Sequence, residues 1–165
     1  MLEKMYNLAK KNNSDLVICD YYEITENNKV VKKAIKHMSE DIKINYMLSN
    51  TSPWNKLIKA DIFKANNIKF MEGYIYEDLA TMPILAEYAK NIIYLEEPLY
   101  NYIIRNGSTM RQKKYNKKLE SIFVAIEYLE KEFKERKLDL KYKEEIEYIY
   151  IEHLLYAASR SFFEI

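Results

Sequence analysis

Glycine is scarce in this chain, and its scarcity limits the turns and loops that the fold can use. Only Gly73 and Gly107 occur among the 165 residues. Two separated glycines cannot form a GxGxxG loop or a P-loop, in which several glycines let backbone N–H groups approach a phosphate. The sequence therefore excludes those nucleotide-binding loops, and it marks two positions where an unusual backbone conformation is expected.

The charge balance and the lengths of the apolar runs narrow the class of protein. Lysine and arginine total 26, aspartate and glutamate total 25, and hydrophobic types make up 48% of the chain. This balance gives no electrostatic basis for nucleic-acid binding, so we expect no nucleic-acid partner. No run approaches the roughly 18 apolar residues that span a bilayer, and Met1 precedes a polar segment rather than a secretory signal. Because its one cysteine, Cys19, cannot form an internal disulfide, we expect a cytoplasmic protein.

Hydrophobic periodicity predicts an α/β arrangement over the first two thirds of the chain. Residues 2–11 have helical spacing, residues 15–22 form a strand with a buried start, and residues 29–35 alternate as its partner strand. The further elements expected up to residue 104 are a helix over 39–50, a loop and short strand over 51–58, a helix over 60–66, an extended piece over 68–71, a helix over 76–90 bent at Pro83, and strands over 92–95 and 99–104.

The final third has a different pattern. Apolar residues recur at helical spacing from Leu119 to Phe133 and again from Ile146 to Phe162, which predicts two helices joined by residues 134–142. Such a helical hairpin must pack on the first part of the chain or on another chain. The change of pattern near Arg111 predicts one domain over 1–111 and a C-terminal helical extension over 112–165.

Three clusters combine aromatic and hydrogen-bonding residues beside predicted loops. They cover 53–57, which holds the only tryptophan, Trp54, then 72–79 and 99–109. This mixture suits carbohydrate, because the C–H face of a sugar stacks on an aromatic ring while its hydroxyls need carboxylate, amide or cationic partners. Each cluster alone also fits an ordinary role as a half-buried anchor, as strand packing or as a turn.

Glu77 and Asp78 stand at the start of a predicted helix, and two interpretations of the pair stay open. The helix dipole stabilises carboxylates at this position, so the pair fits N-terminal capping. The alternative is a general base in a cleft, held in place by the helix behind it. In that role the same dipole is expected to keep the pKa of the base low.

The remaining candidate functional residues are a basic stretch and two histidines. Residues 105–118 hold six cations and no acid, which fits a solvated loop or a contact with phosphates or an anionic membrane surface. Peripheral association with the inner face of a membrane is therefore one hypothesis. His37 and His153 each stand alone and are expected to be surface or core groups, so no metal site is expected in this chain.

The order and spacing of the three clusters resemble the C-terminal, acceptor-side half of the family 2 glycosyltransferases. The segment 14–21 also resembles the strand that follows the metal-binding motif of that family, and the resemblance covers residues 1–111. The matching residues are Trp54-Asn55-Lys56-Leu57, Glu72-Gly73 with Glu77-Asp78-Leu79, and Leu99-Tyr100 with Tyr102, Arg105, Gly107 and Ser108.

The resemblance implies a fold, a reaction and a set of site residues. The fold is part of a GT-A α/β domain, a short mixed sheet with flanking helices followed by a C-terminal helical hairpin. The reaction is transfer of a sugar from a nucleotide-sugar donor to the hydroxyl of a glycan acceptor with inversion, in surface polysaccharide or glycan synthesis. The implied residues are Asp78 as catalytic base beside Glu77, Trp54, Asn55 and Lys56 lining the sugar or acceptor pocket, and Arg105 and Ser108 near the donor phosphates.

The sequence departs from the family in lacking the half that binds the nucleotide. No Asp-x-Asp motif precedes the strand at Leu16, so Mg²⁺ or Mn²⁺ is expected only with the missing half, and no cofactor is expected in this chain. One hypothesis is a half-enzyme that is inactive as this chain alone. The other is a truncated, non-catalytic relative that acts as an interaction or assembly module. In either case the strand at Leu16 is expected to have a bare edge, covered by the tail helices or by a homodimer partner.

Overall fold

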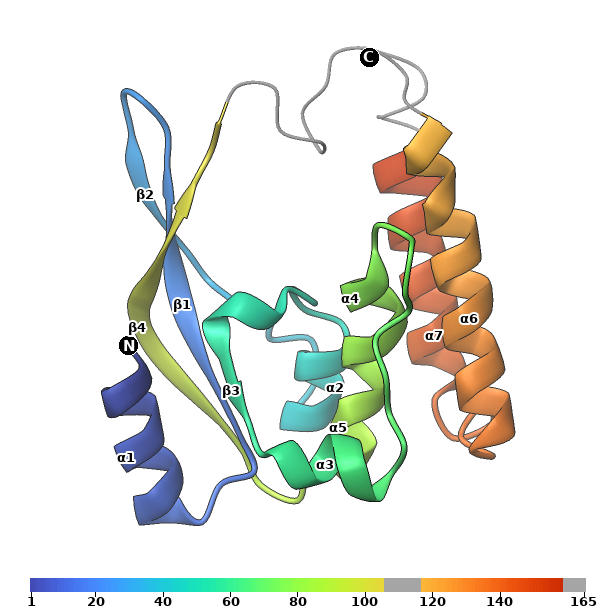
Figure 1. Cartoon of the computed structure of the whole chain (residues 1–165), viewed down its shortest axis with the longest axis horizontal. Coiled ribbons are helices and arrows are strands. Elements are labelled where there is room, and N and C mark those ends of the chain that lie inside the picture. Colours follow the sequence, from blue (N-terminus) through green and yellow to red (C-terminus); the bar gives the residue numbers. More distant parts are fainter. Residues whose placement is uncertain (106–116, 159–165) are drawn as a thin grey trace.

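Strand β1 (Leu16–Ile24) is the centre of a four-stranded mixed sheet (Figure 1). It pairs in parallel with β4 (Ile92–Ile103) along its whole length. Its other edge pairs antiparallel with β3 (Lys56–Ile58) near its start and with β2 (Lys29–Lys32) near its end. The computed structural model describes residues 1–105 and 117–158, and the α/β class with a short mixed sheet and flanking helices is confirmed.

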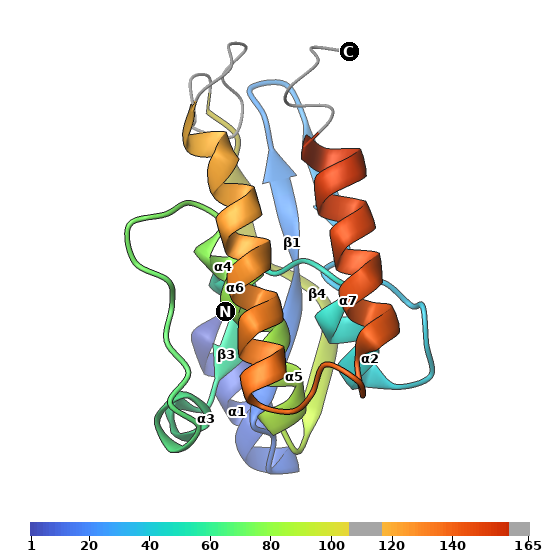
Figure 2. The same ribbon diagram turned by 90° about the vertical axis from the view of Figure 1, so that its right-hand side faces the viewer.

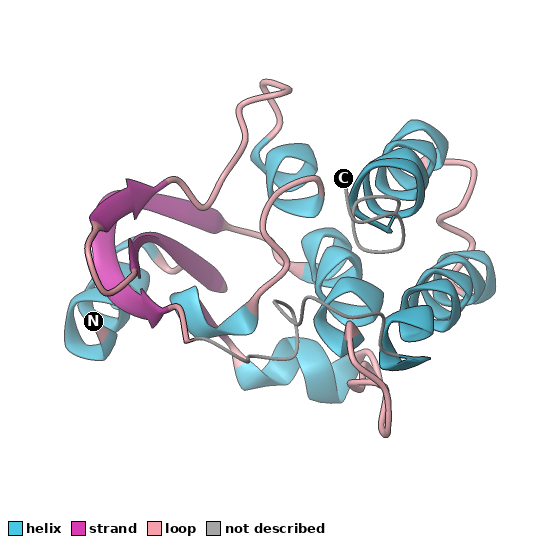
Figure 3. Ribbon diagram, turned by 90° about the horizontal axis from the view of Figure 1, so that it is seen from above, coloured by secondary structure: helices cyan, strands magenta, loops and turns pink. Residues whose placement is uncertain are grey.

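Helices lie on both faces of this sheet, in the layers seen from above in Figure 3. The helix over residues 2–12 covers one face, the short helices between residues 42 and 88 cover the other, and the tail helices form a further layer beyond them (Figures 1 and 2). The α-helices are α1 (Leu2–Asn12), α2 (Ile42–Met47), α3 (Ala60–Ala65), α4 (Glu77–Thr81), α5 (Leu85–Tyr88), α6 (Ser121–Glu135) and α7 (Lys143–Tyr150). Shorter 3₁₀ turns cover Pro53–Asn55, Met82–Ile84 and Lys117–Glu120, and a π-helix (Ile151–Ala158) continues α7.

The alternation of side chains along β1 explains the two cores. Val17 and Cys19 pack with Met5 of α1 on one face of the sheet. Leu16 and Ile18 point to the other face and join the main core, which contains buried residues of α2 to α7. Because a buried strand needs apolar groups on both faces, the run from Leu16 to Cys19 contains no polar residue.

Three predicted elements differ from the structure for local reasons. The strands expected over 92–95 and 99–104 are one strand, because an irregularity of register beside Pro98 lets β4 continue past a residue without an N–H. The extended piece over 68–71 is a loop that buries only Ile68. The helix expected over 39–50 is confined to α2, because the Asn45 side chain binds the backbone of Met38 and Ser39 and holds them outside the helix.

Other expectations hold. Pro83 ends α4 and lies in the 3₁₀ turn that leads to α5, as the bend at this proline predicted. The two tail helices pack on the first part of the chain, with Ile122, Ile126 and Leu129 of α6 in the main core. Among the described residues, no helix combines the length and the apolar composition needed to cross a membrane.

The prediction that β1 has a bare edge is wrong. Both edges of β1 are paired within the chain, by β4 on one side and by β2 and β3 on the other. The tail helices cover the layer of α4 rather than this strand (Figure 1). The argument for a homodimer from an exposed β1 therefore loses its premise, and homodimerisation itself stays a prediction.

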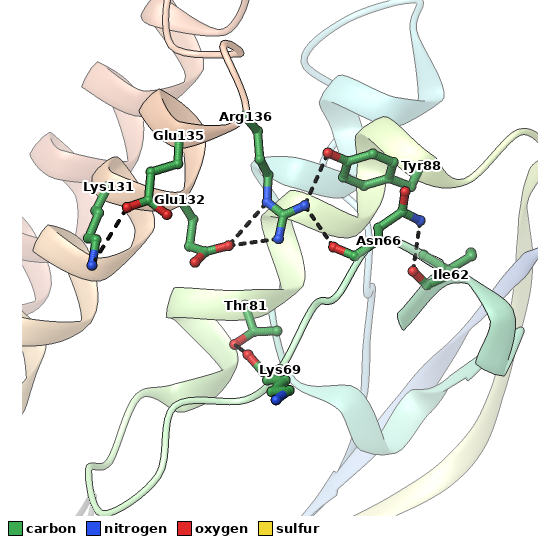
Figure 4. A network of polar contacts seen from close by, with 9 residues as sticks. All are labelled: Ile62, Asn66, Lys69, Thr81, Tyr88, Lys131, Glu132, Glu135 and Arg136. Atoms are coloured by element: carbon green, nitrogen blue, oxygen red, sulfur yellow. Dashed lines mark hydrogen bonds and ion pairs between the residues drawn. The ribbon is translucent and has the colours of Figure 1, made fainter. Parts of the chain in front are cut away.

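A mostly buried arginine fixes the end of α6 against the body of the molecule (Figure 4). Arg136 donates two hydrogen bonds to Glu132 Oε2, from Nε at 3.1 Å and from Nη2 at 2.8 Å. Its Nη1 donates to the backbone oxygen of Asn66 at 3.0 Å and to the hydroxyl of Tyr88 at 3.2 Å. The side chains of Arg136 and Glu132 are only 16% and 18% exposed. The guanidinium thus joins α6 to the end of α3 and to α5.

We expect Arg136→Ala to lower the free energy of unfolding by about 2–3 kcal/mol, because Glu132 and the Asn66 carbonyl lose their partner in a mostly dry setting. The matched control is Lys131→Ala, which breaks the exposed pair with Glu135 one turn away (Figure 4) and should change stability by less than about 0.5 kcal/mol. Urea unfolding measures both variants. Equal effects would show that the buried fork contributes no more than a surface pair.

Candidate functional site

A cavity of about 480 Å³ opens where the end of the sheet meets the start of α4. It brings together three of the residues predicted to form a site, Trp54, Glu77 and Asp78. Its other lining residues come from β1, from the loop before β3, from the segment before α4 and from β4, and they are Tyr21, Glu23, Asn50, Ser52, Ile75, Tyr76 and Tyr102. We call this cavity the aromatic pocket.

The rings of Tyr21, Trp54 and Tyr102 form one wall of the aromatic pocket, and Tyr100, outside the lining, stacks on Trp54. The Trp54 ring stacks on Tyr100 with centroids 4.5 Å apart and on Tyr102 with centroids 5.3 Å apart. Tyr100 and Tyr102 are two residues apart on β4, so both side chains lie on one face of the sheet. Tyr21 meets Trp54 edge-on at 4.8 Å, and its hydroxyl accepts a hydrogen bond from Asn50 Nδ2 at 3.2 Å. The wall is therefore held by packing from β1, β4 and the loop between them.

Glu77 and Asp78 begin α4, after a residue in a strained conformation. The N-cap residue, Tyr76, has φ 67° and makes no side-chain capping bond. A bulky residue rarely adopts this left-handed conformation, which turns the chain sharply into the helix. The N–H of Leu79 donates to Asp78 Oδ1 at 2.8 Å. Asp78 thus binds one amide of the first turn and lines the pocket at the same time, and the general-base interpretation stays a prediction.

The pKa of Asp78 is raised above its usual range, chiefly because the carboxyl group is partly buried. The neighbouring Glu77 carboxylate raises it further, while the Leu79 N–H and the Lys56 ammonium oppose the rise. The expectation that the helix dipole would keep this pKa low is wrong. Helix α4 has only five residues, and the loss of water around the carboxylate outweighs its dipole. Asp78 is therefore a stronger base than a fully solvated aspartate.

Asn55 and Lys56 lie behind the aromatic pocket instead of lining it. Asn55 is fully buried, and its Nδ2 donates to the backbone oxygen of Cys19 on β1 at 2.8 Å. Lys56 Nζ donates to Asn55 Oδ1 at 3.0 Å and to the backbone oxygens of Asn50 at 2.8 Å and Ser52 at 2.6 Å. We call these contacts the Asn55–Lys56 clamp. It fixes the loop that presents Asn50, Ser52 and Trp54 to the cavity.

Lys56 is only 8% exposed, and burial lowers its pKa from 10.5 to about 7, although Asp78 and Cys19 oppose the shift. The three oxygens on Nζ also favour the charged form, because an ammonium has three N–H bonds to donate and an amine has two. Near neutral pH, Lys56 is therefore close to the change between an ammonium that binds all three oxygens and an amine that can donate to two of them.

The remaining predicted residues are not brought into the pocket. Arg105 is exposed just beyond the end of β4 and does not line the cavity. Ser108 and Gly107 lie outside the described residues, as does most of the basic stretch 105–118. The other glycine, Gly73, has φ 83° and precedes the pocket segment, as its rarity predicted.

Sequence reasoning missed several lining residues and one neighbour from the tail. Tyr21 and Glu23 are two residues apart on β1 and therefore share a face, a signal that the alternation of the strand contained. Burial lowers the pKa of His153 on the π-helix, while the Asp78 carboxylate opposes that shift. No local pattern could show that a tail residue comes within electrostatic reach of Asp78.

The carboxylates present do not fit a metal site. Among residues 1–105 and 117–158, no group of three or more histidine, cysteine, aspartate or glutamate side chains is arranged to hold a metal ion. The Mg²⁺ or Mn²⁺ implied by the family resemblance therefore finds no ligand set in the described part of the chain. No step below depends on a metal.

Comparisons with known proteins point to glycosyltransferases. No protein-family model matches the chain. It is 28% identical over 127 residues to glycosyltransferase GlyG of Streptococcus pneumoniae, a match that covers 67% of this chain and 41% of that protein. The chain is thus related, at low identity and over part of its length, to a glycosyltransferase.

Two crystal structures of S. aureus TarS residues 1–349 share the fold. The structure in complex with UDP-GlcNAc has a TM-score of 0.57 at 18% identity and covers 77% of this chain and 38% of that chain. The complex with UDP has a TM-score of 0.51 at 15% identity and covers 81% and 43%. The chain spans about two fifths of the length of these relatives.

The lowered pKa of Lys56 predicts a pH-dependent stability. Between pH 7 and 10.5 the unfolded chain binds more protons at this residue than the folded chain does. The free energy of unfolding should therefore rise with pH in this window, by up to about 1.4 kcal/mol per pH unit. Lys56→Met should remove this slope, and Lys64→Met, an exposed lysine on α3, should keep it. The measurement is urea unfolding across the window. An unchanged slope in Lys56→Met would mean that the three oxygens keep Lys56 charged throughout.

Proposed function

We propose that this chain is the acceptor side of an inverting, GT-A-type family 2 glycosyltransferase, with Asp78 as the general base. The observation that carries the proposal is the position of Asp78, a carboxylate with a raised pKa on the rim of a pocket walled by aromatic rings. The relationship to GlyG supports the reaction class. The TarS complexes hold UDP-GlcNAc and UDP, which supports a nucleotide-sugar as donor here.

The proposed reaction uses Asp78 to take a proton from the acceptor. The acceptor hydroxyl donates a hydrogen bond to the Asp78 carboxylate, and its oxygen attacks the anomeric carbon of the donor sugar from the side opposite the nucleotide. The bond to the nucleotide diphosphate breaks as the new glycosidic bond forms, and the hydroxyl proton passes to Asp78. A base with a raised pKa takes that proton more readily.

The other residues have supporting roles in this proposal. The Trp54 ring packs against the apolar face of a sugar, and Glu77 holds a hydroxyl beside the base. Asn55 and Lys56 are positioning residues that act through the loop they hold. Arg105 and Ser108 lie toward the donor phosphates. Residues 1–111 form the partial GT-A domain and 112–165 its helical extension.

The donor site is proposed to lie in a part of the enzyme that this chain does not contain. The described carboxylates form no metal site, and the chain matches only about two fifths of its relatives. We therefore propose that the chain alone is inactive, and that the complete enzyme works in the cytoplasm, at the inner face of the membrane, in surface polysaccharide or glycan synthesis.

A non-catalytic interaction module is the second candidate. It is favoured by a groove between α6 and α7 that exposes Leu140 at 86% and Ile151 at 58%. Such apolar side chains on an outer face suit contact with another protein.

We expect Asp78→Asn to lower turnover by about 10²–10⁴-fold in a chimera that joins this chain to the part of GlyG outside the match. The measurement is release of UDP from a UDP-sugar in the presence of an acceptor. Asp61→Asn is the matched control, because Asp61 is an exposed carboxylate in the first turn of α3, which is also a short helix. Near-normal transfer by Asp78→Asn would remove Asp78 from the role of base.

We expect calorimetry to detect no binding of UDP-GlcNAc with Mn²⁺ to the chain alone, and binding to the chimera. The reason is that the described lining consists of carboxylates, rings, neutral polar groups and Ile75, which give a diphosphate no cationic partner. Metal-dependent binding to the chain alone would overturn the proposal that the donor site lies elsewhere. Failure of a folded chimera to bind would instead favour the interaction module.

A further inference from the structure

The charged side chains in the described lining of the aromatic pocket have one sign. Its described lining contains three carboxylates, from Glu23, Glu77 and Asp78, and no lysine, arginine or histidine. Lys56, which lies behind the lining, directs its ammonium at three oxygens of its own loop. The described lining therefore presents the negative charge of Glu77 and Asp78 to a ligand in the cavity.

Two of these carboxylates, Glu77 and Asp78, are neighbours in the chain, and their repulsion affects the pKa of Asp78. Burial raises the pKa of that carboxyl, and repulsion from Glu77 adds to the rise. A positively charged group in the cavity would relieve the repulsion, whereas a phosphate or carboxylate would add to it. Charge alone therefore favours a cationic ligand over an anionic ligand in this pocket.

The aromatic wall favours the same class of ligand. The rings of Tyr21, Trp54 and Tyr102 line the cavity beside the carboxylates. An aromatic face attracts a cation through its quadrupole and attracts the C–H face of a sugar through packing. Asn50 and Ser52, also in the lining, supply neutral partners for hydroxyls. Rings, carboxylates and neutral polar groups together suit a molecule that is both hydroxylated and cationic.

We propose that the acceptor taken by the aromatic pocket carries a protonated amine close to its reactive hydroxyl, as an amino sugar or an amino alcohol does. This inference rests on the acceptor role proposed for the pocket and adds the chemical class of the acceptor. The ammonium lies between the Trp54 ring and the carboxylate of Glu77, which leaves Asp78 to receive the hydroxyl proton.

The single tryptophan makes the proposal directly measurable in the chain itself. Trp54 is the only tryptophan, so intrinsic fluorescence reports this pocket without a label. The two probes are methyl glucosaminide and methyl glucoside, which share a ring and differ at C2 in an ammonium or a hydroxyl. Titrations are made at slightly acid pH, where the amine carries its proton.

We expect the glucosaminide to bind about tenfold more tightly than the glucoside, and this preference to weaken at high salt. Glu77→Gln should remove most of the preference. Glu72→Gln, an exposed carboxylate on the same segment but outside the lining, should retain it. Circular dichroism of each variant checks the fold.

The outcomes separate this inference from the function on which it rests. Equal binding of both sugars would overturn the ammonium preference and leave an acceptor pocket for neutral sugars. Equal loss of preference in Glu77→Gln and Glu72→Gln would also overturn it, because the effect would then be general charge rather than the pocket. No response of Trp54 to either sugar, in a chimera that still transfers to another acceptor, would overturn the inference while the transferase proposal stands.

Discussion

The Asn55–Lys56 clamp is the interaction on which the pocket depends. The Asn55 side chain donates to the backbone of Cys19 in the middle of the buried strand, and the Cys19 thiol contacts the Asn55 carbonyl in return. Lys56 Nζ donates hydrogen bonds to the backbone carbonyls of both Asn50 and Ser52. Without these contacts, the polar backbone groups of such a surface loop would bind only water. Here it is anchored to the most buried element of the sheet, so the Trp54 ring has a fixed position against β4.

The second wall of the pocket is fixed from the opposite direction. Helix α4 is too short to be stable alone, but its buried residues Leu79 and Ala80 lie under α6, whose Ile122, Ile126 and Leu129 belong to the main core. Arg136 closes the far end of this contact by binding Tyr88 and the backbone of Asn66. The tail therefore supports the helix that carries Asp78, and the strained Tyr76 before it is tolerated because packing behind α4 holds the turn.

The sequence predicted much of this arrangement, and its failures have physical causes. Periodicity found β1, α1 and the two tail helices, because each buries a regular apolar face. It divided β4 in two, since Pro98 and two glutamates hide the continuity that the register irregularity preserves. For the site, the ordered motifs selected Trp54, Glu77 and Asp78. The family resemblance also placed Asn55 and Lys56 in the pocket lining, and only the three-dimensional structure shows the Lys56 ammonium bound by two backbone carbonyls and the Asn55 side-chain oxygen.

Under the proposed function, an acceptor pocket and a diphosphate site have opposite electrostatic needs. A general base works best where other carboxylates and burial raise its pKa, and the same surroundings repel phosphate. In this chain the carboxylates Glu23, Glu77 and Asp78 collect at one cavity, while Arg105 projects from the end of β4, outside its lining. Under the proposed function, this separation along the sheet keeps the cation of Arg105 apart from the carboxylate proposed as the base. Lys56 is the exception, since its buried ammonium opposes part of the rise in the pKa of Asp78.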